Sequence, residues 1–330
     1  MKNLIYLAYG REVEYNRAIF SVLSFWSWFK GDLSKIRVNV YTDNPEYFNP
    51  FLQGINVHFV RLNEKILNDM LGGGDYIHRR KVKVIEHTFI NYPSDDVLFV
   101  DADTFFIANP TEWLNKLKPG LSYMHIKEYA FEKGLELFTS FGQEKEPTDF
   151  INYLEQKPLL IGNNLEHFNR KDFCWNSGVI GLTANLAAYI PDVLRVTDEL
   201  YKNSSWFIAE QIAFSLVLET KTRIFPSNIY VFHYWGKRQK ALFDELFKKN
   251  IDNIKQNIDE KRYTRSLSQE WKKQIQVDEL IEEANNAFLA KSYNYGIKKI
   301  IKTLIIDPKS ICLVKAIVKL RIKIENSNKI

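Results

Sequence analysis

The sequence predicts an α/β fold in which helices flank a mostly parallel central sheet, followed by a smaller helical region. Short apolar runs that suit buried strands alternate with segments whose apolar residues recur at helical spacing. Leu4 to Ala8 and Val97 to Val100 are two such runs, and Val82, Ile85 and Phe89 share a helical face between them. Strand signals stop near residue 240, and the pattern after that point is helical throughout.

The predicted elements follow one another in β-α order along the first 240 residues. Turn residues such as Gly10 and Pro45 bound the strand-like runs. Residues 125–170 are polar, aromatic and irregular, and we interpret them as an insertion over the rim of the sheet. The predicted strands cover residues 4–8, 37–41, 56–60, 97–100, 179–182 and 228–232, and the predicted helices cover residues 14–29, 76–90, 185–202 and 208–219.

Length and composition indicate a folded protein. At about 150 residues a domain, 330 residues suffice for two domains. Hydrophobic residues make up 45% and aromatic residues 14%, which excludes a mainly disordered chain. A net charge of +5 is too small an excess to indicate a nucleic-acid partner. Cys174 and Cys312 form no CxxC pair, which favours a reducing compartment and a cytoplasmic location. No apolar run approaches the roughly 18 residues that a membrane-spanning helix needs.

Charge divides the chain into two regions. Ten of the 45 bases but only two of the 40 acids lie in residues 291–330, so this segment carries +8 and residues 1–290 carry −3. Together with the end of the strand signals, this predicts a sheet-containing domain over residues 1–240 and a basic helical region over residues 241–330.

Isoleucines and lysines recur at helical spacing in residues 291–330. Such a pattern is typical of a helix that binds an anionic membrane surface, and we expect peripheral attachment through this segment. The alternative is a helical hairpin that packs on the rest of the protein with a solvated basic face. The segment from Ala287 to Pro308 also resembles the second half of a tetratricopeptide repeat.

The sharpest local feature is Asp101-Ala102-Asp103, which directly follows the apolar run at 97–100. Isolated ionised carboxylates are costly to bury, so this pair is expected to bind a cation. Hard divalent ions such as Mg²⁺ or Mn²⁺ prefer oxygen ligands and share them with substrate phosphates. Ligands of open α/β sheets bind beyond the carboxyl ends of the strands, where Tyr9 and Asp101 fall. The alternative is an ordinary acidic turn.

Other phosphate-handling classes fit the same residues less well. A phosphatase of the haloacid-dehalogenase type requires Asp-x-Asp-x-Thr or Asp-x-Asp-x-Val, and the fifth residue here is Phe105. The sequence has no Gly-x-Gly-x-x-Gly and no Gly-Lys-Ser/Thr, so a dinucleotide site and a P-loop both lack their backbone cradle.

The ordered set of motifs resembles the Rossmann-like glycosyltransferase-A fold, and in particular the retaining family 8 that includes glycogenin and bacterial lipopolysaccharide galactosyltransferases. The resemblance covers residues 4 to about 240. Glu210-Gln211 stands where the family has Asp-Gln, and Gln239 stands where the family has a lysine. The other matching segments are Asp101-Ala102-Asp103 for the family's Asp-x-Asp, Trp175-Asn176-Ser177-Gly178-Val179 for its Asn-Ser-Gly, and His233-Tyr234-Trp235-Gly236-Lys237 for its His-Phe-x-Gly-x-x-Lys ending.

The resemblance implies roles for individual residues. Asp101, Asp103 and His233 are expected to bind Mn²⁺ or Mg²⁺. Glu210, Gln211 and Asn176 are expected to be catalytic, with Glu210 stabilising or attacking an oxocarbenium-like centre. The residues expected to bind the nucleotide-sugar are Ala8, Tyr9, Tyr15, Lys83, Asp101, Ala102, Asp103, Asn176, Ser177, Gly236 and Lys237.

Several of these residues also allow simpler interpretations. Tyr15 resembles the family tyrosine that stacks on uracil, and Lys83 the lysine that reaches the donor. From the residues alone, Lys83 also fits a solvated helix surface, Asn176 an Asx turn before Gly178, and Glu210 a plain surface carboxylate.

The predicted function is a metal-dependent glycosyltransferase that moves a sugar from a UDP-sugar donor to a surface glycan or lipid-linked acceptor, with retention of configuration. One rival is a non-catalytic carbohydrate-binding or scaffold protein on the same fold. Another is a sugar nucleotidyltransferase, but such enzymes open with a glycine-rich basic loop that Tyr9-Gly10-Arg11-Glu12 does not supply.

Overall fold

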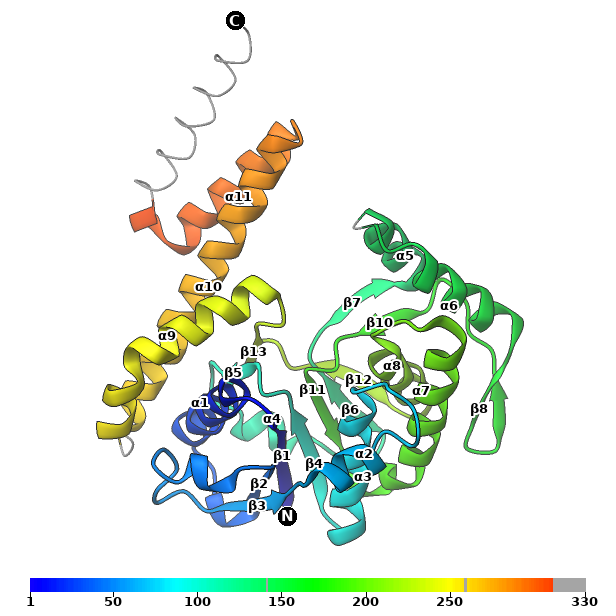
Figure 1. Ribbon diagram of the computed structural model, residues 1–330, viewed down its shortest axis with the longest axis horizontal. Coiled ribbons are helices and arrows are strands. Elements are labelled where there is room, and N and C mark those ends of the chain that lie inside the picture. The colour runs from blue at the N-terminus through cyan, green and yellow to red at the C-terminus, as the bar shows by residue number, and fades with distance from the viewer. Residues whose placement is uncertain (141, 258–259, 311–330) are drawn as a thin grey trace, which may run out of the picture. The chain divides into compact units, whose positions relative to one another are not determined.

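The computed structural model describes residues 1–140, 142–257 and 260–310. The chain divides into two compact units, of which the first is Met1–His233 and the second begins at Tyr234 (Figure 1). The boundary predicted from the sequence lies after residue 240. Residues 311–330, which include Cys312 and half of the predicted basic segment, lie outside the described residues.

A seven-stranded sheet forms the centre of the first unit (Figure 1). Its strands are β1 (Lys2–Leu7), β2 (Ile36–Thr42), β3 (Val57–Arg61), β4 (Asp96–Val100), β6 (Leu121–Met124), β11 (Val179–Leu182) and β12 (Arg223–Pro226). The order across the sheet is β12-β6-β11-β4-β1-β2-β3. Neighbours are parallel except at β11, which is antiparallel to β4 and β6. The predicted α/β class with a mostly parallel sheet is confirmed.

Sequence pattern explains why these strands lie in the centre. Val97, Leu98, Phe99 and Val100 are all buried, as expected for a strand that is covered on both faces. Residues of β1 are likewise buried from Asn3 to Tyr6.

Within the part of the chain that the structure describes, three two-stranded sheets lie outside the central sheet. They pair β5 (Thr104–Phe106) with β13 (Val231–His233), β7 (Lys127–Ala130) with β10 (Phe173–Trp175), and β8 (Leu159–Ile161) with β9 (Asn164–Glu166). The strand predicted at 228–232 therefore forms as β13, but it pairs with β5 and does not join the central sheet.

The expectation that residues 125–170 are irregular is wrong. This segment contains β7, β8, β9 and the helices α5 (Phe131–Ser140) and α6 (Lys145–Gln156). Although most residues of α6 are polar, the helix has an apolar face. Phe150, Ile151 and Leu154 recur at helical spacing on this face and are buried.

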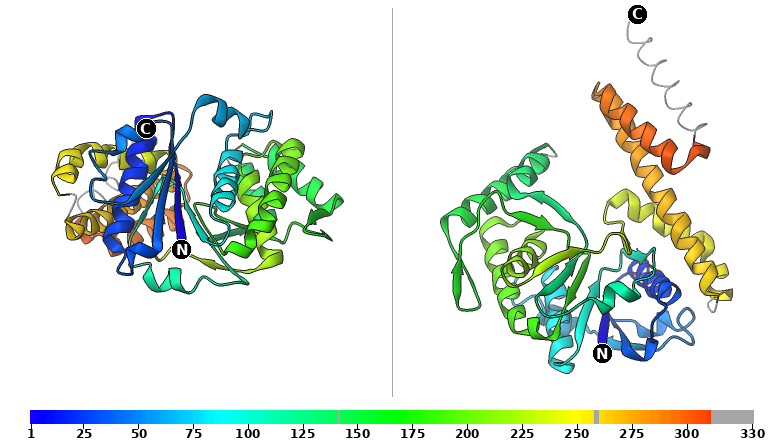
Figure 2. Two further views of the ribbon diagram at one scale, coloured as in Figure 1. Left: turned by 90° about the horizontal axis from the view of Figure 1, so that it is seen from below. Right: turned by 180° about the vertical axis from the view of Figure 1, so that it is seen from behind.

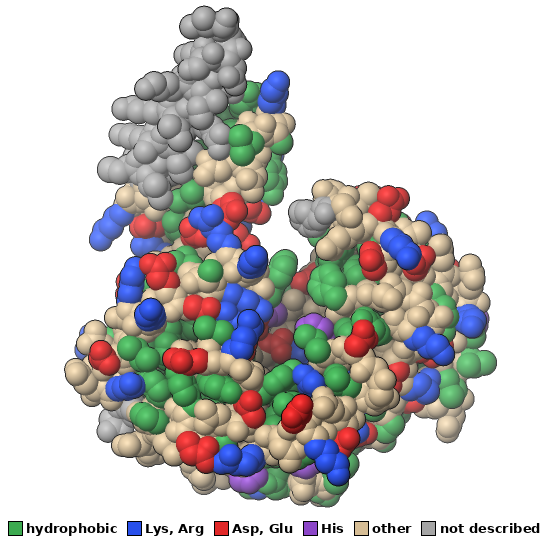
Figure 3. All heavy atoms as spheres, in the orientation of Figure 1, with side chains coloured by type: hydrophobic (Ala, Val, Ile, Leu, Met, Phe, Trp, Pro, Cys, Tyr) green, Lys and Arg blue, Asp and Glu red, His purple; other side chains and the backbone are tan. Residues whose placement is uncertain are grey.

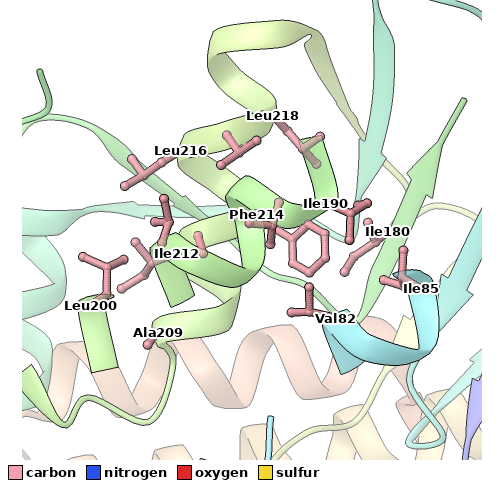
Figure 4. Close-up of a cluster of buried hydrophobic side chains, with 14 of the residues drawn as sticks. Val82, Ile85, Ile180, Ile190, Leu200, Ala209, Ile212, Phe214, Leu216 and Leu218 are labelled. Atoms are coloured by element: carbon pink, nitrogen blue, oxygen red, sulfur yellow. The ribbon is translucent and has the colours of Figure 1, made fainter. Parts of the chain in front are cut away.

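Helices cover both faces of the central sheet. Figure 2 shows α1 (Glu12–Trp28) on one side, and α3 (Arg79–Asn91), α7 (Ile190–Ser204) and α8 (Ala209–Lys221) on the other. Figure 4 shows Val82 and Ile85 of α3, Ile180 of β11 and Phe214 of α8 within one apolar cluster. The shorter helices of this unit are α2 (Glu64–Asp69) and α4 (Thr111–Asn115), with 3₁₀ turns at Leu33–Lys35, Pro45–Phe48 and Ala184–Tyr189.

The described part of the second unit is helical, with α9 (Lys237–Gln256), α10 (Lys261–Leu289), α11 (Tyr293–Ile306) and a 3₁₀ turn at Pro308–Ser310. Tyr234 stacks on Phe243, with the ring centroids 4.4 Å apart. The helices α10 and α11 form a hairpin in which Gly296 admits the Phe288 ring, since a Cβ at Gly296 would lie 2.6 Å from that ring.

The surface carries charges of both signs. Acidic and basic side chains are interspersed over the face drawn in Figure 3. Among the described residues, no helix combines the length and the apolar character that crossing a bilayer requires.

Candidate functional site

The strand order places a switch point between β1 and β4. From β1 the chain adds β2 and β3 on one side and then returns to add β4 on the other. In open α/β sheets, ligands bind at the carboxyl ends of the strands beside such a point. Ala8 and Tyr9 follow β1 here, and Asp101 follows β4.

Asp101, Asp103 and His233 come together at this edge. Each offers a ligand atom, and these atoms all lie within 4.8 Å of one another. The pairing of β5 with β13 explains the meeting, because His233 lies opposite Thr104, the residue after Asp103. The Nε2 atom of His233 is 3.4 Å from Oδ1 of Asp103. Two carboxylates and one imidazole form a donor set that suits a divalent metal ion.

Hydrogen bonding leaves the outer nitrogen of His233 available as a ligand. The Oδ1 atom of Asn176 accepts a bond from the backbone N–H of Gly178 at 3.0 Å, and the same oxygen is 2.9 Å from Nδ1 of His233. The proton of a neutral imidazole must therefore be on Nδ1, and Nε2 keeps its lone pair. Metal-binding histidines in proteins usually have their other nitrogen engaged in this way.

The close approach of His233 also depends on Gly178. A Cβ at this position would lie 2.3 Å from Nδ1 of His233, which is far inside van der Waals contact. The Asx turn considered for Asn176 is present, but the same oxygen also serves His233.

The lysine that reaches the acidic pair is Lys81, which sequence reasoning missed. Its Nζ donates to Oδ2 of Asp101 and to Oγ of Ser177, each at 3.0 Å, and is 3.5 Å from Oε1 of Glu210. Burial alone would lower the pKa of Lys81, but the carboxylates of Asp101 and Glu210 raise it above its usual value. Lys81 therefore stays charged and offsets part of the negative charge of its two neighbours.

The structure places the predicted Lys83 differently. Its ammonium group forms an ion pair with Glu86 on the same helix. Residues two apart on a helix point in nearly opposite directions, so Lys81 and Lys83 cannot reach the same group. Of the neighbouring arginines, Arg79 pairs with Asp198, and Arg80 donates to the hydroxyl of Tyr9 at 2.7 Å.

Glu210 is buried, which excludes the surface alternative. Only 3% of the residue is exposed, and its Oε2 accepts a hydrogen bond from Oγ of Ser177 at 3.2 Å. Burial raises the pKa of this carboxyl to about 7, although the nearby Lys81 opposes the shift. Glu210 lies in the first turn of α8, and its backbone N–H donates to the hydroxyl of Tyr76 at 3.0 Å.

A second residue that sequence reasoning missed is Glu128 on β7. Its two oxygens accept one hydrogen bond each, from Nδ2 of Asn176 and from Nε2 of Gln211, both at 3.0 Å. Burial raises the pKa of Glu128, while these two hydrogen bonds oppose the rise. Gln211 in turn accepts a bond from the backbone N–H of Ser177 at 3.2 Å.

A second histidine lies beside His233. The ring of His125 meets that of His233 edge to face, with the ring centroids 5.3 Å apart. Its Nε2 donates to the carbonyl oxygen of Val231 at 3.1 Å. Burial and the neighbouring His233 lower the pKa of His125 to about 3, so this ring is neutral.

Residues after β1 and β2 form a neighbouring part of the same edge. Asp43 accepts hydrogen bonds from the backbone N–H of Gly10 at 3.0 Å and from the hydroxyl of Tyr15 at 2.7 Å. Tyr15 is buried against Tyr47, and Ala8 is buried as well. Only Tyr9 of the three predicted residues after β1 is partly exposed.

The remaining predicted residues fall in different places. Ala102, which separates the two aspartates in the sequence, is buried. Ser177 accepts a hydrogen bond from Lys81 and donates one to Glu210. Gly236 and Lys237 belong to the second unit, where they begin α9.

One of the missed residues left a signal in the sequence. Lys81 shares a helical face with Val84, Ile85 and Thr88, all of which are buried. A charged residue on an apolar face is unusual and points to a buried partner. No comparable pattern surrounds Glu128.

No protein-family model matches the chain, and no curated protein matches it in sequence. The fold and the site define a mixed α/β protein with a mostly parallel sheet and a candidate Asp-Asp-His metal cluster at the switch point of that sheet.

Proposed function

We propose that this chain is a metal-dependent glycosyltransferase of the glycosyltransferase-A type that uses a UDP-sugar donor. The observation that carries the proposal is the Asp101–Asp103–His233 cluster at the carboxyl edge of the sheet, with Nε2 of His233 facing Asp103. A nucleotide diphosphate would bind at this edge and share the ion with the two carboxylates.

A second line of support comes from the residues around the cluster. Asn176, Ser177, Glu210 and Gln211 were singled out from two separate segments of the sequence. Hydrogen bonds join Ser177 to Glu210 and Gln211, and Glu128 joins Gln211 to Asn176. Lys81 joins this network to Asp101. Each of these motifs is common by itself, but their combination in one site with consistent chemistry is rare.

In the proposed mechanism, Asp101, Asp103 and His233 would hold the ion. Carboxylates suit both Mg²⁺ and Mn²⁺, and the imidazole ligand favours Mn²⁺ of the two. Such an ion supplies charge neutralisation for the departing nucleoside diphosphate. Tyr9 and Arg80 lie at the same edge and would contact the nucleotide, with the Arg80 guanidinium oriented by its hydrogen bond to Tyr9.

Glu210 and Gln211 would face the reacting sugar carbon. A buried carboxylate stabilises positive charge that develops on the sugar ring more strongly than a solvated one, because the surrounding dielectric is low. Lys81 holds Glu210 in place and partly balances its charge in the resting site. We propose retention of configuration and a glycan or lipid-linked acceptor.

The direct test is release of UDP from a panel of UDP-sugars in the presence of Mn²⁺, with Asp103→Asn as the inactive control. The proposal predicts metal-dependent UDP release with at least one donor and loss of that release by at least a hundredfold in the variant. A sugar nucleotidyltransferase would instead release pyrophosphate from a nucleoside triphosphate and a sugar phosphate. A carbohydrate-binding protein without turnover would give neither product.

We further propose that α11 attaches the enzyme to an anionic membrane surface. Ile297, Ile301 and Ile305 are 50%, 53% and 75% exposed and recur at four-residue spacing along this helix. Lys298 and Lys302 are exposed at the border of the same apolar stripe, and α11 contains no acidic residue. Apolar side chains flanked by bases suit a helix that lies in the headgroup region of an anionic lipid layer. The proposed location is the cytoplasmic surface of a membrane, where the buried free thiol of Cys174 stays reduced.

A further inference from the structure

The half-buried carboxylate of Glu128 accepts hydrogen bonds from two side-chain amides beside the candidate metal ligands. One oxygen accepts from Nδ2 of Asn176 and the other from Nε2 of Gln211, each at 3.0 Å. A carboxylate offers acceptors on both oxygens and no donor, so each amide must present its NH₂ group to Glu128. Both amide oxygens consequently point the other way.

The Asn176 branch ends at His233. With its NH₂ group on Glu128, Asn176 directs Oδ1 to the backbone N–H of Gly178 and to Nδ1 of His233. Because Oδ1 can only accept, the proton of the imidazole is held on Nδ1. Nε2 is then unprotonated where it lies 3.4 Å from Asp103.

The Gln211 branch ends at Ser177. With its NH₂ group on Glu128, Gln211 directs Oε1 to the backbone N–H of Ser177 at 3.2 Å. The hydroxyl of Ser177 accepts from Lys81 and donates to Glu210. The carboxylate of Glu128 is thus connected by hydrogen bonds to the candidate metal ligand His233 and to the candidate catalytic residues Gln211 and Glu210.

We propose that Glu128 is a positioning residue that fixes the amide orientation of Asn176 and Gln211 and, through Asn176, holds His233 in the tautomer that can ligate a metal ion. The inference rests on the proposed function only in assigning a metal to Asp101, Asp103 and His233. The tautomer itself is a property of the metal-free protein and can be measured without turnover.

Replacement by glutamine shows why a carboxylate is required. In a Glu128→Gln variant, the new side chain would have one acceptor and one donor where two amides donate. Either Asn176 or Gln211 must then turn, and each turn brings an NH₂ group against a backbone N–H, that of Gly178 or that of Ser177. A turned Asn176 would donate its NH₂ group to Nδ1 of His233, so Nδ1 would have to accept. The proton of the neutral imidazole would then be on Nε2, which could no longer bind a metal ion.

The experiment measures the tautomer of His233 in the full chain by long-range ¹H–¹⁵N NMR of ¹⁵N-histidine-labelled protein. The His233 signal is assigned by its absence in His233→Ala. We expect the metal-free wild-type protein to hold the proton on Nδ1 and Glu128→Gln to move a substantial fraction of it to Nε2. The dissociation constant for Mn²⁺, followed by the EPR signal of the free ion, should rise about tenfold, as for other residues that orient metal ligands.

A rescue variant separates orientation from general damage. In Glu128→Gln combined with Gln211→Glu, the new amide donates to the new carboxylate and accepts from Asn176, while that carboxylate still accepts from the Ser177 N–H. Nε2 of Gln211 also lies 3.2 Å from Sγ of Cys174, and in the double variant the thiol can donate to the new carboxylate instead of accepting from the amide. Every donor then again faces an acceptor, and net charge is unchanged. The double variant should recover the Nδ1–H tautomer and most of the Mn²⁺ affinity.

Glu219→Gln is the matched control. Glu219 is another carboxylate with a pKa raised by burial, and its Oε1 accepts from Nε1 of Trp175, outside the His233 network. This variant should keep the wild-type tautomer and affinity. Thermal melts show which variants fold, and if the single variant does not fold, recovery of folding by the double variant supports the same donor–acceptor requirement.

The inference is overturned if Glu128→Gln retains the wild-type tautomer and Mn²⁺ affinity, or if the double variant is no better than the single one. Failure of the proposed function has a different signature, because wild-type protein would then bind no Mn²⁺ while the tautomer still depended on Glu128.

Discussion

The unit that spans Met1–His233 buries ionisable side chains at one edge of its sheet, whereas the unit that begins at Tyr234 exposes isoleucines along its last described helix. Lys81 and Glu210 are 7% and 3% exposed. Ile301 and Ile305 are 53% and 75% exposed. Charged residues are rarely buried and large aliphatic residues are preferentially buried, so each unit departs from the usual distribution in the opposite direction.

The two departures differ in how they are compensated. Arg17, Lys81 and Glu210 are buried in the first unit and each has a partner of opposite sign, as Lys81 has in Asp101. Ile297, Ile301 and Ile305 of α11 are at least half exposed among the described residues, so burial gives them no comparable role in folding. The first arrangement is therefore expected to be sensitive to substitution, and the second to be nearly indifferent to it as far as stability is concerned.

The largest effect is expected from Lys81→Met. This change leaves the carboxylates of Asp101 and Glu210 without their shared cation and should lower the free energy of unfolding by about 3–5 kcal/mol at pH 8. Urea denaturation of the metal-free protein measures it.

Lys83→Met on the same helix is its control. Lys83 is partly exposed and pairs with Glu86, so the loss should stay below about 1 kcal/mol. Equal destabilisation by the two substitutions would mean that burial of Lys81 has no special role.

Glu210→Gln should make the metal-free protein more stable and should abolish the proposed release of UDP. Burial raises the pKa of Glu210 to about 7, so between pH 5 and pH 7 the folded protein keeps a proton that the unfolded chain has lost. The stability of the wild-type protein therefore falls as pH rises through this window, by about 3 kcal/mol in total.

The variant has no carboxyl at this position and should lack that part of the pH dependence. At pH 8 it should exceed the wild-type protein by about 2 kcal/mol, while near pH 5 the two should be similar. Parallel urea titrations at both pH values measure the difference. A variant that is less stable than wild type at pH 8 would contradict the buried-charge account of Glu210.

Gly178→Ala tests the close approach of His233. A Cβ at this position would lie 2.3 Å from Nδ1, so the imidazole must move away from Asn176. The expected cost is about 1–3 kcal/mol of stability together with weaker Mn²⁺ binding. Gly120→Ala is not an equivalent control because Gly120 has φ +82°, whereas Gly74 has an ordinary φ and a Cβ there would make only an ordinary contact, 3.6 Å from the carbonyl oxygen of Leu71. Gly74→Ala should leave Mn²⁺ binding unchanged, and an equal loss in both variants would refute the steric argument.

The smallest effect on stability is expected in the second unit. The triple change Ile297→Ser, Ile301→Ser and Ile305→Ser removes the exposed stripe of α11 and should alter the free energy of unfolding by about 0.5 kcal/mol or less per site. It should, however, abolish co-sedimentation with vesicles that contain phosphatidylglycerol.

Three outcomes distinguish the possible occupants of this stripe. Binding to anionic vesicles that the triple change removes supports the membrane proposal. Concentration-dependent dimerisation that the change removes would instead assign the stripe to a second copy of the chain. Strong destabilisation by the change would show that the stripe packs inside the protein.

The sequence predicted the parts of the fold that depend on local pattern. Apolar runs identified β1, β4 and β11, because strands covered on both faces are apolar along their length. The segments that form β2 and β3 mix apolar and polar residues and were identified by their short length and their flanking turn residues. The pattern missed β5, β6 and β12. It also missed the two helices of residues 125–170. In α6, for example, the buried apolar residues such as Phe150 are fewer than the polar residues around them, so the helical spacing is hard to recognise.

The candidate site was predictable where one segment carries the chemistry and not where distant segments meet. Asp101 and Asp103 stand together in sequence, and His233 was recognised through a family resemblance. Lys81 and Lys83 are equally plausible from spacing to Asp101, and only the direction of the helix face separates them. Glu128 acts through Asn176 and Gln211, which are distant in sequence, so no local pattern marks it.

The central claim is that Asp101, Asp103 and His233 hold one divalent ion. Titration of the purified chain with Mn²⁺, followed by EPR, tests it without any assumption about donor or acceptor. We expect one bound Mn²⁺ per chain, loss of that binding in Asp103→Asn, and retention in Asp43→Asn, which alters a carboxylate at the same edge outside the cluster. A wild-type protein that binds no Mn²⁺, or an Asp103→Asn variant that binds it as tightly as wild type, would show that these three residues do not hold the ion.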